Sequence, residues 1–183
     1  MRKPPAKLDT EGLAAYALRT LGARSLSTGE LRQRLRRKAE RLGDVEGVIA
    51  RMRDHGYLND RQFAETFAAA RRDNQGLGQA RVLRELRVRR VASGVAEQAV
   101  RNAYQETNEA ALAEAYLARK FRNKDLASEL QDPKNLASAY RRLRYAGFGS
   151  AASIRMLKRY AAQAEELASG EESQDEEAGG HHE

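Results

Sequence analysis

Residue types that could carry out catalysis are scarce in this sequence. The 183-residue chain contains no cysteine, which excludes thiol nucleophiles, disulfides and thiolate metal sites. His181 and His182 follow an acidic segment and are interpreted as an incidental pair or the remnant of a tag. His55 lies near a predicted helix end, where a histidine ordinarily meets exposed backbone carbonyls. A catalytic base is the alternative, but no second histidine, cysteine or carboxylate cluster accompanies it, so we expect no enzyme activity and no metal site.

Phosphate-binding loops are no better supported. Gly76-Leu-Gly78 precedes a predicted helix, but it lacks the Lys-Ser or Lys-Thr of a P-loop and the spacing of a dinucleotide-binding fingerprint. We interpret it as a loop and helix cap. The carboxylates of Glu30, Asp60 and Asp132 likewise stand where a helix cap or a first-turn charge is expected. The sequence therefore predicts no bound cofactor.

Arginine is the residue type whose number and placement point to a function. All 33 lysines and arginines lie at or before Arg159, and residues 1–164 hold 18 of the 26 acidic residues, so this part carries a net charge of +15. The eight acidic residues of 165–183 give that segment a charge of −8. Arginine suits two-pronged contact with phosphate or carboxylate. A polyanion, or a protein rich in carboxylates, is the expected partner.

The elements that position these arginines are predicted to be helices. Tryptophan is absent and aromatic residues make up 6% of the chain, so the core must be built mainly from Leu, Ala and Val. β-Branched residues are too scattered for the alternating pattern of strands. Two capping boxes mark helix starts, Ser27 with Glu30 and Asn59 with Gln62. The fold class is predicted to be all-α.

One joint, Gly56-Tyr-Leu-Asn-Asp60, closes one helical unit and opens the next. Gly56 can adopt the left-handed conformation that ends a helix. Tyr57 and Leu58 are predicted to fold back onto that helix and hold it against the following unit. Asn59 then caps the helix that begins at Asp60. A joint of this kind predicts repeated helical units.

Apolar spacing supports the repeat. Leu35 and Ile49, Leu86 and Val100, and Leu143 and Leu157 are each fourteen residues apart, and Leu31, Val82 and Ala139 each lie four before the first member. The simplest account is an elongated array of three tandem three-helix repeats. The predicted divisions are a basic arm (1–11), repeat 1 (12–58), repeat 2 (59–107), repeat 3 (108–164) and an acidic disordered tail (165–183).

Local signals place the individual helices. Helix N-caps are predicted at Asn108, at Asp132 with Pro133 in the first helical position, and at Ser150, and a helix end is predicted at Gly147. In repeat 1 the second helix is predicted to reach Leu42 and to end at Gly43. The predicted helices cover residues 13–21, 28–42, 45–55, 60–73, 78–89, 93–105, 109–121, 133–145 and 150–160, with a loose turn at 126–130.

Basic residues gather on the second helix of each unit, away from the apolar stripe. If the repeats stack, these residues form a continuous basic surface. The candidate binding residues are Arg32, Arg36, Arg37 and Lys38 in repeat 1, Arg84, Arg87 and Arg89 in repeat 2, and Arg141, Arg142 and Arg144 in repeat 3. A merely solvated face is the alternative, but the charge of +15 favours a binding surface.

Helix-turn-helix recognition of DNA is a competing interpretation, because three-helix units with a capped middle helix resemble that motif. A sequence-specific reader mixes arginine with Asn, Gln or Ser that contact base edges. The candidate helices here carry arginine and leucine almost uniformly. They favour nonspecific attraction over base readout.

The segment from Tyr16 to Leu35, the joint Gly56-Tyr-Leu-Asn-Asp60 with Phe63-Ala64, and residues 78–86 and 141–148 resemble the RecX regulators of bacterial RecA recombinase. The resemblance spans residues 12–160. It departs from the family where glycine often follows the second helix, since this chain has Ala39 and Arg90 there and keeps only Gly147. The acidic tail lies outside the shared pattern.

The resemblance implies a regulator, not an enzyme, that lies in the groove of the RecA nucleoprotein filament. It would restrain filament extension, ATP hydrolysis, strand exchange and co-protease activity, and so act in DNA repair, homologous recombination and the SOS response. The expected partners are the RecA filament and, more weakly and nonspecifically, single- and double-stranded DNA. Because the sequence has no signal-peptide pattern and no run of eighteen apolar residues, a cytoplasmic location is expected. The protein is also expected to be a monomer. The alternative is a nonspecific DNA-binding helical-repeat protein or a helix-turn-helix regulator.

Overall fold

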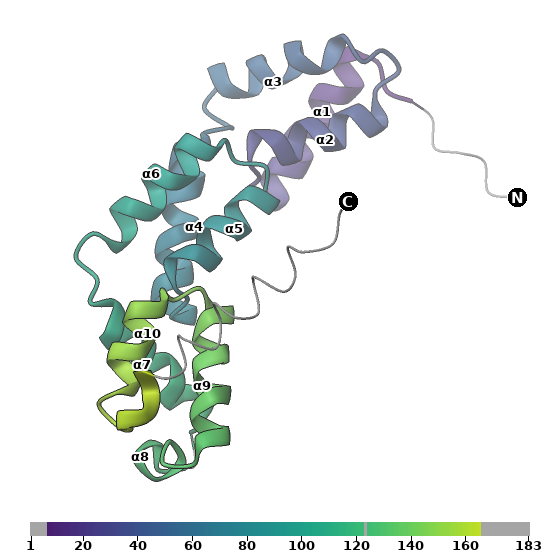
Figure 1. Ribbon diagram of the computed structural model, residues 1–183. Helices are drawn as coiled ribbons and strands as arrows, with labels where there is room; N and C mark the ends of the chain where they lie inside the picture. The colour runs from purple at the N-terminus through teal and green to yellow at the C-terminus, as the bar shows by residue number, and fades with distance from the viewer. Residues whose placement is uncertain (1–6, 123, 166–183) are drawn as a thin grey trace, which may run out of the picture. The chain divides into compact units, whose positions relative to one another are not determined.

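The computed structural model describes residues 7–122 and 124–165, and all regular elements in these ranges are helices (Figure 1). This confirms the all-α prediction. The elements are α1 (Thr10–Ala23), α2 (Thr28–Lys38), α3 (Asp44–Asp54), α4 (Asp60–Gln75), α5 (Gln79–Val88), α6 (Ser93–Tyr104), α7 (Glu109–Lys120), α8 (Leu126–Glu129), α9 (Pro133–Ala146), α10 (Ser150–Leu157) and the 3-10 helix η1 (Ala162–Glu165).

The chain forms two compact units, and the middle of the sequence contributes to both. The first unit falls within residues 1–68 and 83–102, and the second within residues 69–82 and 103–183. Helices α4, α5 and α6 therefore each have residues in both units. The division into three repeats stays a prediction, and the residues of repeat 2 are shared between the two compact units.

The core of the first unit lies between α1, α2 and α3, which Figure 1 shows packed together. Its fully buried apolar side chains include Leu13, Leu31, Leu35 and Ile49, and the last three belong to the predicted repeat pattern. Leu8 pairs with Ala39 in an isolated bridge, and its N–H donates to the carbonyl of Lys38 at 2.8 Å. Residues 7–11, which were predicted to belong to the basic arm, are therefore part of this fold; residues 1–6 lie outside the described ranges.

The core of the second unit is built by α7, α9 and α10. Leu117, Leu143, Phe148 and Leu157 are fully buried there. The ring of Tyr116 tilts against Phe148 with 5.9 Å between centroids. This core continues to Ala164 in η1; most of the predicted acidic tail, residues 166–183, lies outside the described ranges.

Most helix boundaries follow the predicted caps. The reciprocal capping box of Ser27 and Glu30 is present, Asn108 accepts from the N–H of Ala111, and Asp132 caps α9 with Pro133 in the first turn. Gly147 ends α9 with a left-handed φ of 92°. The nine residues of the fourteen-residue spacing pattern are all buried, as a common repeat frame requires.

Three boundary predictions were wrong. Helix α2 ends at Lys38 and Ala39 becomes extended because it pairs with Leu8; Leu42 is 66% exposed, and Gly43 precedes α3 instead of ending α2. In the second unit, Ser150 is the first residue of α10 and makes no N-cap, because its hydroxyl hydrogen-bonds that of Tyr140 at 2.8 Å. Helix α10 also ends at Leu157, before the predicted 160.

Candidate anion-binding surface

On α2, part of the predicted basic set is bound to the neighbouring helix. Arg32 makes a two-pronged ion pair with Glu46 of α3, with Nε–Oε1 at 2.8 Å and Nη2–Oε2 at 3.1 Å. The hydrogen bond raises the pKa of Arg32 and lowers the pKa of Glu46. Arg36 reaches the same carboxylate at 3.9 Å. These two arginines help to hold α2 against α3, and a partner would have to compete with Glu46 for them.

Arg37 and Lys38, at the end of α2, are less engaged. Their carbonyls accept hydrogen bonds from the Lys7 ammonium and the Leu8 N–H, respectively. The side chain of Arg37 is exposed and makes no ion pair with any described residue. It is the clearest candidate contact on this helix.

On α5, the three predicted arginines have different surroundings. Arg84 is exposed and makes no ion pair within the described ranges. Arg87 pairs with Glu97 of α6 at 3.5 Å. Arg89 pairs with Glu30 at 3.1 Å and lies over the ring of Phe67 at 5.7 Å. Arg89 thus links the end of α5 to α2 and α4, and a partner would have to compete with Glu30 for it.

On α9, Arg141 corresponds to Arg84 in the repeat frame and is also exposed, with no ion pair to a described residue. Arg142 lies over the ring of Phe121 at 5.9 Å. Arg144 donates from Nη1 to the carbonyl of Phe148 at 2.9 Å. Arg141 is therefore the residue of this group most available to a partner.

An exposed apolar residue accompanies each of the available arginines Arg84 and Arg141, and sequence reasoning missed both. Val88 on α5 is 76% exposed and Tyr145 on α9 is 74% exposed. Each lies four residues after its arginine, Arg84 or Arg141, so the two share a helix face. The repeat frame could have identified them, because both stand two residues after the buried leucine of their helix.

The joint between the first two repeats behaves largely as predicted. Gly56 has a φ of 74°, and Leu58 is 5% exposed within the first unit's core. Asn59 accepts from the N–H of Gln62 at 3.0 Å. The side chain of Asp60 also makes a contact outside its own helix. Its Oδ1 atom accepts a hydrogen bond from the N–H of Thr28 at 2.7 Å and so links α4 to the start of α2.

Tyr57 and His55 complete the surroundings of the joint. Tyr57 stacks on His55, the residue that ends α3, at 6.3 Å between ring centroids. It therefore lies against the end of that helix as predicted, although it is 55% exposed. The Nδ1 atom of His55 lies 2.8 Å from the carbonyl oxygen of Arg51, the helix-end environment that the sequence predicted. Within the described ranges, no three histidine or carboxylate side chains gather as metal ligands would.

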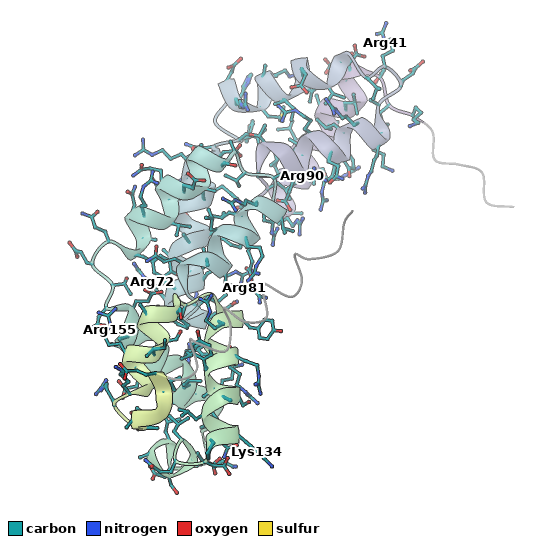
Figure 2. The ribbon with its side chains drawn as sticks, in the orientation of Figure 1. Arg41, Arg72, Arg81, Arg90, Lys134 and Arg155 are labelled. Carbon is teal, nitrogen blue, oxygen red and sulfur yellow. The ribbon has the colours of Figure 1, made fainter. Side chains whose placement is uncertain are left out.

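Two end-to-end helix contacts were not predicted at all. In the first unit, the start of α2 meets the end of α5: Ser27 donates its hydroxyl to the carbonyl of Arg89, and a Cβ on Gly29 would lie closer than 3.0 Å to the carbonyl oxygen of Arg90. Figure 2 shows Arg90 at this end of α5. The contact requires the absence of a side chain at Gly29.

In the second unit, the start of α5 meets the end of α9 in the same way. The N–H of Gly78 donates to the carbonyl of Ala146 at 2.8 Å, and that of Ala80 to Gly147 at 3.1 Å. A Cβ on Gly78 would lie closer than 3.0 Å to backbone atoms of Gly147. Gly78, interpreted from sequence as part of a loop and cap, thus allows close backbone approach. Each second helix that carries candidate arginines is fixed at an end by such a contact.

Known proteins provide an independent comparison. Residues 59–100 match the family model described as the second three-helix domain of RecX. The chain is 34% identical over 149 residues to the regulatory protein RecX of Deinococcus radiodurans, covering 81% of this chain and 68% of that protein. It is 31% identical to the regulatory protein RecX of Pseudomonas entomophila, covering 83% and 94%. The crystal structure of RecX from Lactobacillus salivarius superimposes with a TM-score of 0.65 at 17% identity, covering 82% and 96%.

The helices of the described ranges include none that is both long and apolar enough to cross a lipid bilayer.

Proposed function

The chain belongs to the RecX family of regulatory proteins, and we propose that it binds the RecA nucleoprotein filament and restrains its recombinase, ATPase and co-protease activities. The observation that carries this proposal is the recurrence of an exposed arginine, Arg84 and Arg141, at the same position of successive repeats. A filament presents the same subunit surface and the same DNA phosphates again and again. A chain that repeats its own contact can engage several points along the filament at once.

Multivalent binding explains why such a regulator would act on filaments. Each exposed arginine contributes a modest contact, since an exposed ion pair is worth about 0.2–1 kcal/mol. Contacts on one chain reinforce one another, because after the first contact forms, the others form at a high effective concentration. Filament binding is then favoured over binding to a free RecA monomer. The setting proposed for this activity is the cytoplasm, during recombinational DNA repair and the SOS response.

The direct test measures ATP hydrolysis by RecA on single-stranded DNA with this protein present below the RecA concentration. We expect hydrolysis to fall and filaments to shorten, because one regulator contacts several subunits. Hydrolysis and filament length that stay unchanged, even at low salt, would contradict the proposal. Cleavage of a RecA-dependent self-cleaving repressor provides the matching assay of co-protease function.

The second candidate is a nonspecific DNA-binding helical-repeat protein, with a helix-turn-helix regulator as its sequence-specific form. It is favoured by the net charge of +15 on residues 1–164. The two candidates separate when binding to bare and RecA-coated DNA is compared across salt concentrations. A purely electrostatic DNA binder loses affinity steeply with salt and shows no preference for the coated strand.

A further inference from the structure

The exposed face of α9 joins Arg141, which the proposed function already uses, to residues that it does not use. Lys134, Ser138, Arg141 and Tyr145 are spaced by four, three and four residues, so they share one face of the helix. From Lys134 to Tyr145 this stripe extends for about 16 Å along the helix axis at 1.5 Å per residue. The opposite face, with Leu136, Ala139 and Leu143, is buried in the second unit.

The charge of α9 is wholly positive. It carries one lysine and three arginines and no acidic residue. The preceding Asp132 is occupied in capping the helix, where its carboxylate accepts from the N–H groups of Lys134 and Asn135. Arg81 adds a further cation at the other end, where its Nη1 donates to the carbonyl oxygen of Tyr145 at 3.4 Å. Figure 2 shows Arg81 and Lys134 at opposite ends of α9.

Tyr145 is an aromatic side chain left exposed beside these cations. A tyrosine at 74% exposure contributes little to the core, whereas an accessible aromatic ring next to arginine is the arrangement that single-strand-binding proteins use. A base in a duplex is already stacked on both faces, so the ring can stack only on an unpaired base. Lys134 and Arg141 lie along the helix where they can meet successive phosphates.

We propose that this face of α9 binds single-stranded DNA, with Tyr145 stacked on an unpaired base and Arg141 and Lys134 against phosphates of the strand on one side of that base. The inference deepens the proposed function and rests on it for its setting, because a RecA filament is assembled on a single strand. It assigns the α9 face to the DNA component of that filament. Repeat 2 has Val88 where repeat 3 has Tyr145, so the stacking contact is specific to repeat 3.

The absence of tryptophan from the chain provides a clean test without RecA. A Tyr145→Trp variant of the full chain is titrated with oligodeoxythymidine, and we expect quenching of its fluorescence as the introduced ring stacks on a base. A strand of equal length without bases carries the same phosphates, and we expect weaker binding and little quenching. Leu42→Trp is the matched control, because Leu42 is exposed beside Arg41 but lies in the turn between α2 and α3; little quenching is expected there.

Affinity variants complete the test. Tyr145→Ala is expected to weaken binding of oligodeoxythymidine by about fivefold or more, given the cost of removing one stacked base, while Tyr145→Phe retains it and helix content is unchanged in both. Unchanged affinity of Tyr145→Ala, equal affinity for the abasic strand, or a preference for duplex DNA or for oligouridine would overturn the proposal. If Tyr145→Ala weakens binding to DNA-free RecA and leaves binding to the strand unchanged, the proposal is also overturned and Tyr145 is assigned to a protein contact. Because no RecA is present in the strand titrations, failure here is distinguishable from failure of the proposed function.

Discussion

Arg90 holds a backbone conformation that ordinarily belongs to glycine. Its φ is 58°, the one positive value at a non-glycine residue within the described ranges, and it stands where glycine often ends the second helix of a repeat. The left-handed conformation costs an ordinary residue about 1–2 kcal/mol. Ala39, at the same position of repeat 1, avoids this cost by becoming extended and pairing with Leu8.

We expect Arg90→Gly to raise the free energy of unfolding by about 0.5–1 kcal/mol. Relief of the left-handed strain exceeds the greater freedom that glycine gives the unfolded chain. The variant also loses a hydrogen bond from the Arg90 Nε to Gln33, at 3.1 Å on the surface. Urea unfolding, followed by helix content, measures the difference.

The matched control for Arg90 is Gln33→Ala, which removes the same hydrogen bond and leaves the backbone unchanged. It is expected to be neutral or slightly destabilising. If Arg90→Gly lowers stability by more than Gln33→Ala does, side-chain contacts of Arg90 outweigh its backbone strain.

At the scale of the helices, the end-to-end contacts at Gly29 and Gly78 fix the elements that carry the candidate arginines. A methyl group at either position would meet backbone atoms of the neighbouring helix, which cannot move aside as a side chain can. We expect Gly29→Ala and Gly78→Ala each to lower the free energy of unfolding by about 1–3 kcal/mol, the usual cost of overpacking. Thermal or urea unfolding of each variant provides the measurement.

Gly47 offers the opposite case within the same chain. It lies inside α3, and a Cβ there meets nothing within 4 Å, so Gly47→Ala is expected to stabilise by about 0.5–1 kcal/mol. Equal effects of alanine at Gly29 and Gly47 would show that helix propensity, and not close approach, decides the outcome.

These contacts also mark the limit of what the sequence could predict. Helix starts at Ser27 and Asn108 were predictable, because a cap and its helix are neighbours in the chain. The end of α2 was not, since it depends on Leu8, about 30 residues away. The ion pair between Arg89 and Glu30 could not be predicted for the same reason, because the two residues are far apart in the sequence. Residue type and spacing identified the basic helices. Only the three-dimensional structure distinguishes arginines that contact a neighbouring helix from arginines that remain exposed.

At the scale of the whole chain, that separation changes which arginines should matter most for binding. Arg87 faces Glu97 and Arg142 lies over Phe121, so reversing their charge would disturb contacts within the fold. Arg84 and Arg141 stand at equivalent positions of two repeats and can be changed with less effect on stability. They test whether binding is shared between repeats.

We expect Arg84→Glu and Arg141→Glu each to weaken binding to RecA-coated DNA by about two- to fivefold, corresponding to about 0.5–1 kcal/mol for an exposed ion pair. The double variant should weaken binding by at least the product of the two effects, because linked contacts on separate repeats contribute together. Binding is measured across salt concentrations, with helix content as the check on folding. Arg155→Glu is the matched control, since Arg155 is an exposed arginine of α10 (Figure 2) and the change in net charge is identical. If Arg155→Glu weakens binding as much as either single variant, net charge alone governs the interaction and the second helices are not the binding surface.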